Sequence, residues 1–311
     1  MAVTSLRARG ETRGNTHVHA RLARKLQLVR RRAWTLAFIV PFLAFFGVFH
    51  LYPTVNAFVE SFKCNVATAP GWCGLTNYRY VWTNSIWLTS LYNTVVFSII
   101  STVISVVVAI VAASLVAKNT RLNRLLRSMW FFPSILSVSV VTVIFSSLFA
   151  TNLGWVSEIL SLLHVSSPNL LGSGLVITSL AAVSSWWTFG IPMLILVAAM
   201  TQIPEGVRDA AAIDGAVGVR YVWHVVLPLV RSAIVVVVVL QFSNAFRAFA
   251  LPYILTKGGP GLSSFFVMLY YNANAFMSYH LGLGNAIGYS IAVPIGIVSA
   301  IYVRFLRRRG I

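Results

Sequence analysis

The chain has 311 residues, of which 58% are hydrophobic and only 10% are charged, and its mean hydropathy is +0.81. Soluble domains average about 45–50% apolar and about 25% charged residues, so this composition excludes a water-soluble fold and predicts an integral membrane protein. The formal net charge is +18, with nine of the 24 basic residues in the first 33 positions and four in the last eight. These cations flank hydrophobic segments, so we expect contact with membrane lipid and no nucleic-acid partner.

Residues 1–33 are polar and basic, and we expect them to form a cytoplasmic N-terminal tail. Leu22, Leu26 and Val29 recur at helical spacing among arginines. That pattern is typical of a helix on an anionic membrane surface, and a solvated arm that only sets orientation is the alternative. The apolar run that follows lacks a small-residue cleavage site and is too long for a signal peptide, so it is interpreted as a retained first span.

Six apolar stretches are long enough to cross a bilayer, which takes roughly 20 residues. They are Trp34–Ala57, Tyr92–Val116, Met129–Ala150, Gly174–Met200, Leu229–Leu255 and Gly284–Val303. The prediction is an all-α polytopic membrane protein whose domain 34–311 has six transmembrane helices. A seventh stretch, Phe265–Met277, is too short to cross and contains Asn272 and Asn274, so we expect an outer-surface or re-entrant helix there.

The loops predict the orientation of these spans. With the amino terminus inside, the inner side carries 20 basic residues, whereas the outer side carries Lys63, Arg79 and Lys257, and Arg247 lies within a span. Basic residues favour the cytoplasmic side of a membrane. Both termini are therefore expected in the cytoplasm, and the chain in the plasma (bacterial inner) membrane.

Two cysteines, Cys64 and Cys73, lie close together in one polar loop on the expected outer side. A disulfide forms readily there if the loop faces an oxidising compartment. The spacing alone does not establish the bridge, so the pairing stays open.

The inner segment between the fourth and fifth spans, 201–227, has a helical pattern of its own. Pro204 and Glu205 suit the first turn of a helix, because proline needs no amide partner there and a carboxylate faces the positive end of the helix dipole. Ala210–Ala212 leave the backbone nearly bare, so another protein could approach closely.

The same segment is expected to contain a second helix. Asp214-Gly215 ends the first helix, and Ala216–Val226 leads into Pro228 at the start of the fifth span. Two short helices at the membrane face could transmit the motion of a partner protein to the spans. A merely interfacial connector is the alternative.

The run Asp209-Ala-Ala-Ala-Ile-Asp-Gly-Ala216, followed by Leu227-Pro228, resembles the EAA loop of binding-protein-dependent ABC importer permeases. In that family the first acid is glutamate, where this chain has Asp209, and an aromatic residue stands where this chain has Val222. The residues that the resemblance implies for coupling to an ATPase are Glu205, Asp209, Ala210, Ala211, Asp214, Gly215, Ala216, Val222 and Pro228.

Three further stretches resemble the carbohydrate-uptake, maltose-type branch of that family. They are Gly74-Leu-Thr-Asn-Tyr78, Asn93-Thr94 and Leu255-Thr-Lys-Gly-Gly-Pro260. The resemblance implies a type I ABC importer transmembrane domain that moves a sugar or related carbohydrate by alternating access. It also implies a second permease subunit that makes the pore a heterodimer, two ABC ATPase subunits and an extracytoplasmic solute-binding protein.

No G-x-x-x-x-G-K-[ST] stretch occurs in the chain. We therefore expect it to bind no cofactor and not to be an enzyme, with ATP-Mg held by the partner ATPase subunits. No acidic residue lies in the middle of a span, which disfavours an ion-coupled secondary carrier that relays protons, although sodium coupling stays open. The histidines form no metal spacing, so no metal site and no catalytic site are predicted. A membrane scaffold without a solute path is a further alternative.

Polar residues within the apolar spans are candidates for a solute path. Gln241, Asn244 and Arg247 follow one another at intervals of three in the fifth span, where they should point into the bundle or toward a partner permease. The alternative is that the two amides only join helices and the arginine extends to the membrane surface. Arg247 also leaves open an anionic solute such as glycerol phosphate, although a neutral sugar is the first choice.

Aromatic residues in the fourth span are the second candidate set. Trp186, Trp187 and Phe189 precede Gly190 and Pro192, where we expect a kink. Their rings could stack on pyranose faces, and core packing is an equally good interpretation.

Overall fold

The computed structural model describes residues 37, 39–66, 69–150, 154–162 and 168–308, so the predicted basic tail 1–33 lies outside the described residues. The chain divides into two compact units, Met1–Glu60 and Ser61–Ile311. Each unit is described by itself.

The first unit contributes one apolar helical stretch. Its described part, Ile39–Glu60, is 22 residues long and apolar enough to cross a membrane, and none of it is buried. It includes a π-helical turn, η1 (Gly47–Leu51), followed by α2 (Tyr52–Glu60). The prediction of a membrane-spanning segment after the basic tail agrees with this helix.

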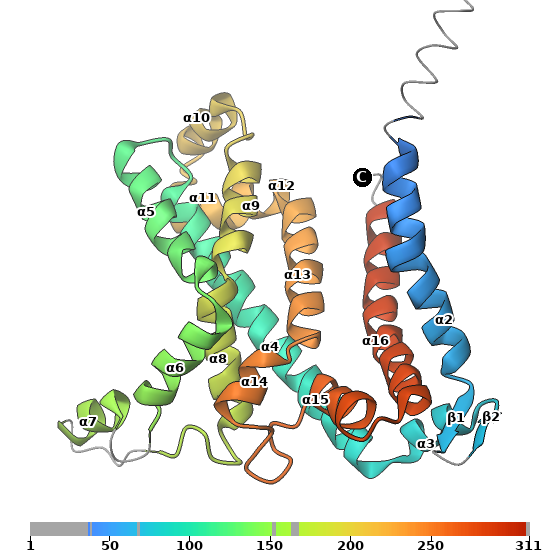
Figure 1. The fold of residues 1–311 in the computed structure, drawn as a ribbon. Coiled ribbons are helices and arrows are strands. Elements are labelled where there is room, and N and C mark those ends of the chain that lie inside the picture. The colour runs from blue at the N-terminus through green and yellow to red at the C-terminus, as the bar shows by residue number, and fades with distance from the viewer. Residues whose placement is uncertain (1–36, 38, 67–68, 151–153, 163–167, 309–311) are drawn as a thin grey trace, which may run out of the picture. The chain divides into compact units, whose positions relative to one another are not determined.

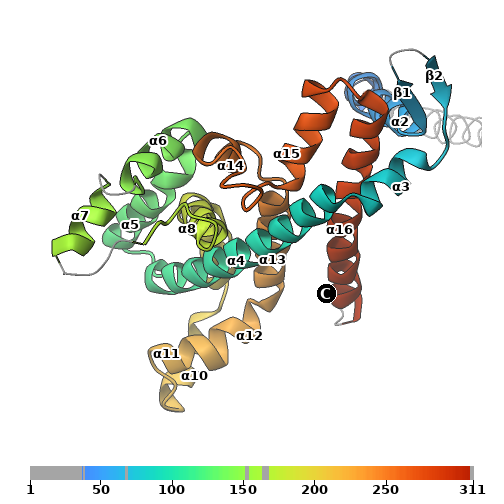
Figure 2. The same cartoon turned by 90° about the horizontal axis from the view of Figure 1, so that it is seen from below.

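The second unit is organised around α4 (Ser85–Val116), a helix of 32 residues. The side chain of Asn84 caps it by accepting hydrogen bonds from the amides of Ile86 and Trp87. The buried face of α4 contacts α8, α9 and α13 (Figure 1), and the view from below shows α8 and α13 next to α4 (Figure 2). Many of the buried α4 residues are serine or alanine, whose small side chains let neighbouring helices approach closely.

The third predicted span, Met129–Ala150, is wrong in its start and its continuity. The helical stretch begins earlier, with α5 (Arg121–Phe131) and η2 (Phe132–Ile135), and continues as α6 (Val138–Leu148) after a bend of 91°. Pro133 lacks an amide hydrogen, and the backbone at Leu136 and Ser137 is extended. These features break the span into two helices.

The fourth span is bent as the sequence predicts. It consists of α8 (Val176–Thr188) and α9 (Gly190–Met200), which meet at 50°. Gly190 allows close approach to η2 here, because a Cβ atom at this position would lie 2.6 Å from Ser134 Oγ and 3.0 Å from Phe131 Cα. The kink prediction is therefore confirmed.

The fifth predicted span, Leu229–Leu255, is not one continuous helix. A chain of short helices, α11 (Val219–Tyr221), η3 (Val222–Val226) and α12 (Leu227–Leu229), meets α13 (Arg231–Phe246) at 79°. At its other end α13 stops at Arg247, and α14 (Ala250–Leu255) follows as a separate element. The sequence predicted that Arg247 lies within one continuous span, and this prediction is wrong. Arg247 is instead the residue that ends α13, in the break before α14.

The stretch Phe265–Met277 is short and helical, in agreement with the prediction that it does not cross. It forms α15 (Val267–Asn272) and η4 (Ala273–Met277). Burial, and to a smaller extent Tyr80, raises the pKa of Tyr270 on α15 to about 12, so its phenol is neutral at physiological pH. The last element, α16 (Leu281–Arg308), contains Pro294 and includes the predicted sixth span.

The remaining elements lie outside these apolar helices. They are the antiparallel hairpin β1 (Lys63–Val66) and β2 (Ala69–Trp72), α3 (Thr76–Thr83) and α7 (Trp155–Leu162). By length and composition, two helices in the described ranges could cross a membrane, or up to five if each bent pair counts as one span. The apolar helix at the start of α16 is shorter.

Candidate functional site

The predicted coupling segment lies at one end of the second unit. Its first helix, α10 (Glu205–Ile213), projects there, whereas α14 and α15 lie at the opposite end (Figure 1). Glu205 is the first residue of the helix, as expected, and Pro204 precedes it in an extended conformation. The chain turns after Asp214, where the Gly215 and Ala216 amides donate to the carbonyls of Ala212 and Ala211 over 3.1 Å and 2.8 Å.

The second predicted helix of this segment begins three residues later than Ala216, at Val219. The cause is local backbone geometry, because Gly215 has φ of +70° and Gly218 has φ of +58°. Both values belong to the left-handed region that glycine adopts without steric cost. The segment therefore consists of α10, a turn that contains Gly215 and Gly218, and a second helical stretch that begins with α11 and continues through α12 to α13.

Much of this segment is exposed. Within α10 only Ala211 is buried, and Asp209 and Ala210 are exposed. Ile213 is 87% exposed and Val219 84%, and Trp223 is also exposed. Of the other predicted coupling residues, Pro228 is exposed, and Ala216 and Val222 are half-buried. The segment therefore presents three large apolar side chains, Ile213, Val219 and Trp223, at its surface.

Basic residues gather at the α10 end of the second unit. The start of α5 with the loop before it, the segment α10–α11 and the start of α13 lie at this end (Figure 1). They hold Lys118, Arg121, Arg208, Arg220 and Arg231. The hairpin, α3 and the loop after α14 lie at the other end and hold Lys63, Arg79 and Lys257. The fold thus separates these two groups of basic residues.

A cavity of about 440 Å³ lies between α4, α6, α8, α13 and the segment that follows α13. Four of the six predicted solute-path residues line it, namely Trp187, Gln241, Asn244 and Arg247. Hydroxyl groups of Ser101, Ser184 and Thr188 and the ring of Phe249 also belong to its lining. Amides, hydroxyls and aromatic rings are groups that orient a polar organic ligand.

Gln241 connects three helices beside this cavity. It is buried, and its Nε2 donates hydrogen bonds to Ser105 Oγ on α4 over 2.7 Å and to Thr188 Oγ1 on α8 over 3.0 Å. Both amide hydrogens are therefore used within the bundle. Gln241 thus joins helices, which was one of the two alternatives for this residue. The same residue also lines the cavity.

Asn244 and Arg247 differ from Gln241 because both are exposed. They lie one turn apart near the end of α13, and the Arg247 Nε donates to the Ser243 carbonyl over 3.1 Å. That bond uses one of the five N–H donors of the guanidinium. Among the residues that the structure describes, the other guanidinium donors of Arg247 make no hydrogen bond, and Arg247 lines the cavity.

The aromatic candidates divide into one cavity residue and two packing residues. Trp187 lines the cavity, its Nε1 donates to the Leu136 carbonyl over 3.0 Å, and its own carbonyl accepts from Ser134 Oγ over 2.9 Å. Trp186 packs edge-on against Phe145 with ring centroids 5.3 Å apart. Phe189 is buried in the core between α4 and α9. Neither of the last two is in the cavity lining.

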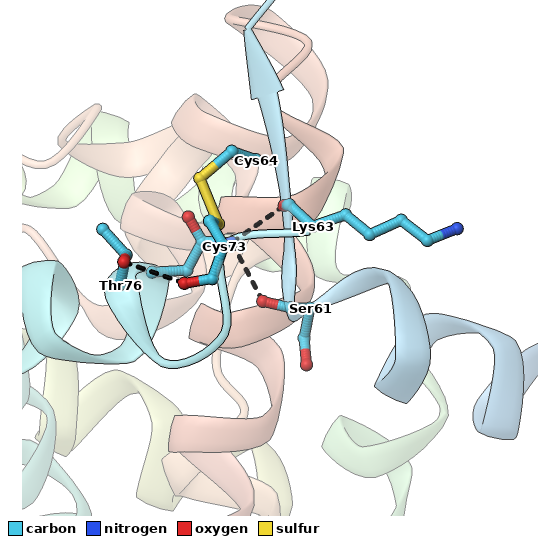
Figure 3. Close-up of a disulfide and its surroundings, with 6 residues drawn as sticks. Ser61, Lys63, Cys64, Cys73 and Thr76 are labelled. Atoms are coloured by element: carbon cyan, nitrogen blue, oxygen red, sulfur yellow. Dashed lines mark hydrogen bonds between the residues drawn. A yellow bond between two sulfur atoms is a disulfide. The ribbon is translucent and has the colours of Figure 1, made fainter. Parts of the chain in front are cut away.

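Cys64 and Cys73 are joined by a disulfide that closes the hairpin (Figure 3). The Thr76 hydroxyl donates to the Cys73 carbonyl over 2.9 Å, and Asn77 Nδ2 donates to the carbonyls of Ser61 and Lys63 over 2.9 Å and 3.0 Å. These bonds attach the hairpin to α3. They also give a structural role to Thr76 and Asn77 of the Gly74–Tyr78 stretch.

Sequence reasoning missed how Asn93 and Thr94 act. Asn93 Nδ2 donates to the Leu262 carbonyl over 2.7 Å, and Thr94 Oγ1 accepts from the Val267 amide over 3.0 Å. Together they hold the segment after α14 against α4. The sequence did contain a sign of this role, because Asn93 and Thr94 are two polar residues at the start of an apolar span. Polar groups without hydrogen-bond partners are costly there.

Ser101, Ser184, Thr188 and Phe249 were also missed, because single hydroxyls and rings in apolar spans are common packing residues. Within the described ranges, no three His, Cys, Asp or Glu side chains gather as a metal site.

Comparison with known proteins gives the family of the chain. Residues 105–310 match the family described as binding-protein-dependent transport system inner membrane component. The chain is 27% identical over 282 residues to the arabinooligosaccharides transport system permease protein AraP of Bacillus subtilis, covering 88% of each protein. It is 28% identical over 281 residues to the trehalose/maltose transport system permease protein MalF of Thermococcus litoralis, covering 87% of this chain and 92% of that protein.

A third relative is the sulfoquinovosyl glycerol transport system permease protein SmoG of Agrobacterium fabrum, 24% identical over 287 residues, covering 89% of this chain and 92% of that protein. Among solved structures, a chain of a bacterial alginate ABC transporter in complex with a pentasaccharide-bound periplasmic protein superposes with a TM-score of 0.78 at 16% identity, covering 89% of this chain and 96% of that chain. The fold is therefore that of an ABC importer membrane domain, as predicted. The chain belongs to the family of binding-protein-dependent transport system inner membrane components, and it is therefore a transport permease.

Proposed function

We propose that this chain is one permease subunit of an ATP-driven importer and that it moves a carbohydrate across the bacterial inner membrane. The membership of the transport family supports the first part. The second part is supported by relatives whose names specify arabinooligosaccharides, trehalose or maltose, and sulfoquinovosyl glycerol. The single observation that carries the proposal is the exposed helix α10, held by a rigid turn and joined to the helix that lines the cavity.

In this proposal α10 inserts into a groove of an ABC ATPase subunit. The exposed backbone of Ala210 and the apolar side chains of Ile213 and Val219 offer a surface that such a groove would cover. Two ATPase subunits and a second permease complete the assembly, which makes the membrane pore a heterodimer. The chain itself binds no cofactor, and ATP-Mg belongs to the ATPase subunits.

Movement of the ATPases would reach the cavity through a short chain of elements. The turn after α10 continues into α11, η3 and α12, and α12 meets α13 at Val230. A pull on α10 would therefore rotate α13, whose residues Gln241 and Asn244 line the cavity. Alternating access follows if that rotation opens the cavity to one side and closes it to the other.

The orientation belongs to the same proposal. We place the α10 end in the cytoplasm, because Lys118, Arg121, Arg208, Arg220 and Arg231 lie in segments at that end. The basic residues of the first 33 and last eight positions support cytoplasmic termini on the same principle. The disulfide-closed hairpin and α3 face the oxidising side, where a solute-binding protein would deliver the solute.

Uptake measurements in the native organism test this proposal. Deletion of the gene should abolish uptake of at least one labelled carbohydrate from a panel of neutral and acidic mono- and oligosaccharides, and the wild-type gene should restore it. That uptake should stop when ATP is depleted and continue when the sodium and proton gradients are collapsed with ATP maintained. Uptake that follows an ion gradient and survives ATP depletion would instead identify a secondary carrier.

A further inference from the structure

The geometry points to Arg247 as a specificity residue that selects carbohydrates bearing a carboxylate. This inference deepens the proposed function and depends on it, because it takes the cavity at the end of α13 as the solute site. It concerns the charge of the solute, about which the family of the chain says nothing.

The charge of the cavity lining is unbalanced. Its residues include one cation, Arg247, and no aspartate or glutamate. Among the described residues, the Arg247 side chain bonds only to the backbone, through the hydrogen bond from its Nε to the Ser243 carbonyl. The cavity therefore carries one positive charge without a carboxylate beside it.

The end of α13 brings this cation to the cavity. The helix stops after Phe246, and Arg247 takes a non-helical conformation with φ of −96° and ψ of 14°. Its Nε bond to Ser243, one turn earlier, fixes one edge of the guanidinium against the helix end. The Nη groups remain available, and a planar pair of donors matches the two oxygens of a carboxylate.

The rest of the lining suits the remainder of such a solute. Asn244 is exposed one turn before Arg247, and Ser101 and Ser184, whose hydroxyls can bond sugar hydroxyls, also line the cavity. Trp187 and Phe249 provide ring surfaces for the apolar face of a pyranose. A neutral sugar would use these groups equally well but would leave the guanidinium without an anion.

Physical chemistry favours the acidic solute. A planar guanidinium binds a carboxylate by two parallel hydrogen bonds, whereas a neutral hydroxyl offers no such pair of charged oxygens. A charge-assisted hydrogen bond is roughly twice as strong as a neutral one. We therefore expect an acidic sugar to bind at least about tenfold more tightly than its neutral counterpart.

Binding to the purified full-length chain in lipid nanodiscs tests the inference. Sodium glucuronate and glucose are titrated at equal ionic strength, and binding is followed by tryptophan fluorescence, with Trp187→Phe used to assign the signal to the cavity. The variants are Arg247→Gln, which removes the charge, Arg247→Lys, which keeps a charge without the planar fork, and Lys257→Gln, a cation outside the cavity lining, as the matched control.

The wild type and Lys257→Gln should prefer glucuronate at least about tenfold, Arg247→Gln should lose that preference while still binding glucose, and Arg247→Lys should keep a part of it. Equal binding of both sugars to the wild type, or an unchanged preference in Arg247→Gln, would overturn the inference and leave the proposed function intact. No binding of either sugar to the wild type would reject the cavity as the solute site and the inference with it.

Discussion

The coupling segment around α10 and the cavity beside α13 are built in opposite ways. α10 packs little against the rest of the molecule, and its shape is set by residues close together in the sequence, above all Gly215 and Gly218 with positive φ. The cavity is built from residues on five helices, some of them far apart in the chain, such as Ser101 and Gln241. A surface that binds a partner can be specified locally, whereas a cavity depends on packing.

The largest effect is expected from Gly215→Val. Space is not the reason, because a Cβ atom at Gly215 would meet nothing within 4 Å, but φ of +70° costs a β-branched residue about 1–2 kcal/mol or more. The turn should rearrange and change the direction in which α10 points. Uptake should therefore be lost, while the chain still inserts into the membrane. Labelled-carbohydrate uptake and quantitative blots of purified membranes measure the two effects.

Gly206→Ala is the matched control for that variant. Gly206 lies in α10, its Cβ would also meet nothing within 4 Å, and its φ is not positive. Uptake should stay close to the wild-type rate. If Gly215→Val were as active as Gly206→Ala, the turn would not set the position of α10.

The next effect separates Gln241 from Asn244 within the cavity. Gln241→Ala removes two hydrogen bonds inside the bundle, to Ser105 and Thr188, and should lower the free energy of unfolding by about 1–3 kcal/mol. Asn244→Ala removes an exposed side chain and should leave the melting temperature unchanged while reducing solute binding. Thermal unfolding in detergent distinguishes them, and equal melting temperatures for both variants would contradict the helix-joining role of Gln241.

A smaller loss of stability is expected from Trp187→Phe. The indole N–H bond to the Leu136 carbonyl disappears, whereas an aromatic ring remains at the cavity. The free energy of unfolding should fall by about 0.5–1.5 kcal/mol. Trp186→Phe is the control, because Trp186 is not in the cavity lining and a ring would still face Phe145. A larger loss of stability in Trp186→Phe than in Trp187→Phe would argue against the bond to Leu136 as a link between the third and fourth spans.

The smallest effect concerns the hairpin, and it tests the orientation. Cys64 and Cys73 are the two cysteines of the sequence, and the structure joins them. In intact spheroplasts, a membrane-impermeant maleimide should label the chain only after treatment with an impermeant phosphine reductant. Labelling without reduction would show free thiols, and labelling only after membrane lysis would place the hairpin in the cytoplasm.

The sequence predicted local features better than packed ones, and the reason is physical. The start of α10 at Glu205, the kink near Gly190 and the short helix at Phe265–Met277 each depend on proline, glycine or asparagine acting within a few residues. Apolar composition correctly indicated most of the spans. It could not show that the third and fifth spans are broken, because hydropathy does not register a change of direction.

The cavity was only partly predictable for the same reason. The spacing of three grouped Gln241 with Asn244 on one face of α13, and Arg247, which follows the end of that helix, lines the same cavity. Spacing could not reveal that the Gln241 amide donates both hydrogens to side chains on two other helices. It also could not show that Phe189 packs into the core while Trp187 lines the cavity. Those distinctions depend on neighbours distant in the sequence.

Photo-crosslinking in native membranes shows whether an ABC ATPase subunit binds α10. A photoreactive amino acid is placed at Ile213, which is 87% exposed beside the turn, and at Tyr279, which is 80% exposed between η4 and α16 as the control. The probe at Ile213 should crosslink to a protein with a nucleotide-binding P-loop, which mass spectrometry identifies. The probe at Tyr279 should not crosslink to that protein. An Ile213 probe that crosslinks only to lipid, or to no ATPase while Gly215→Val abolishes uptake, would contradict such binding.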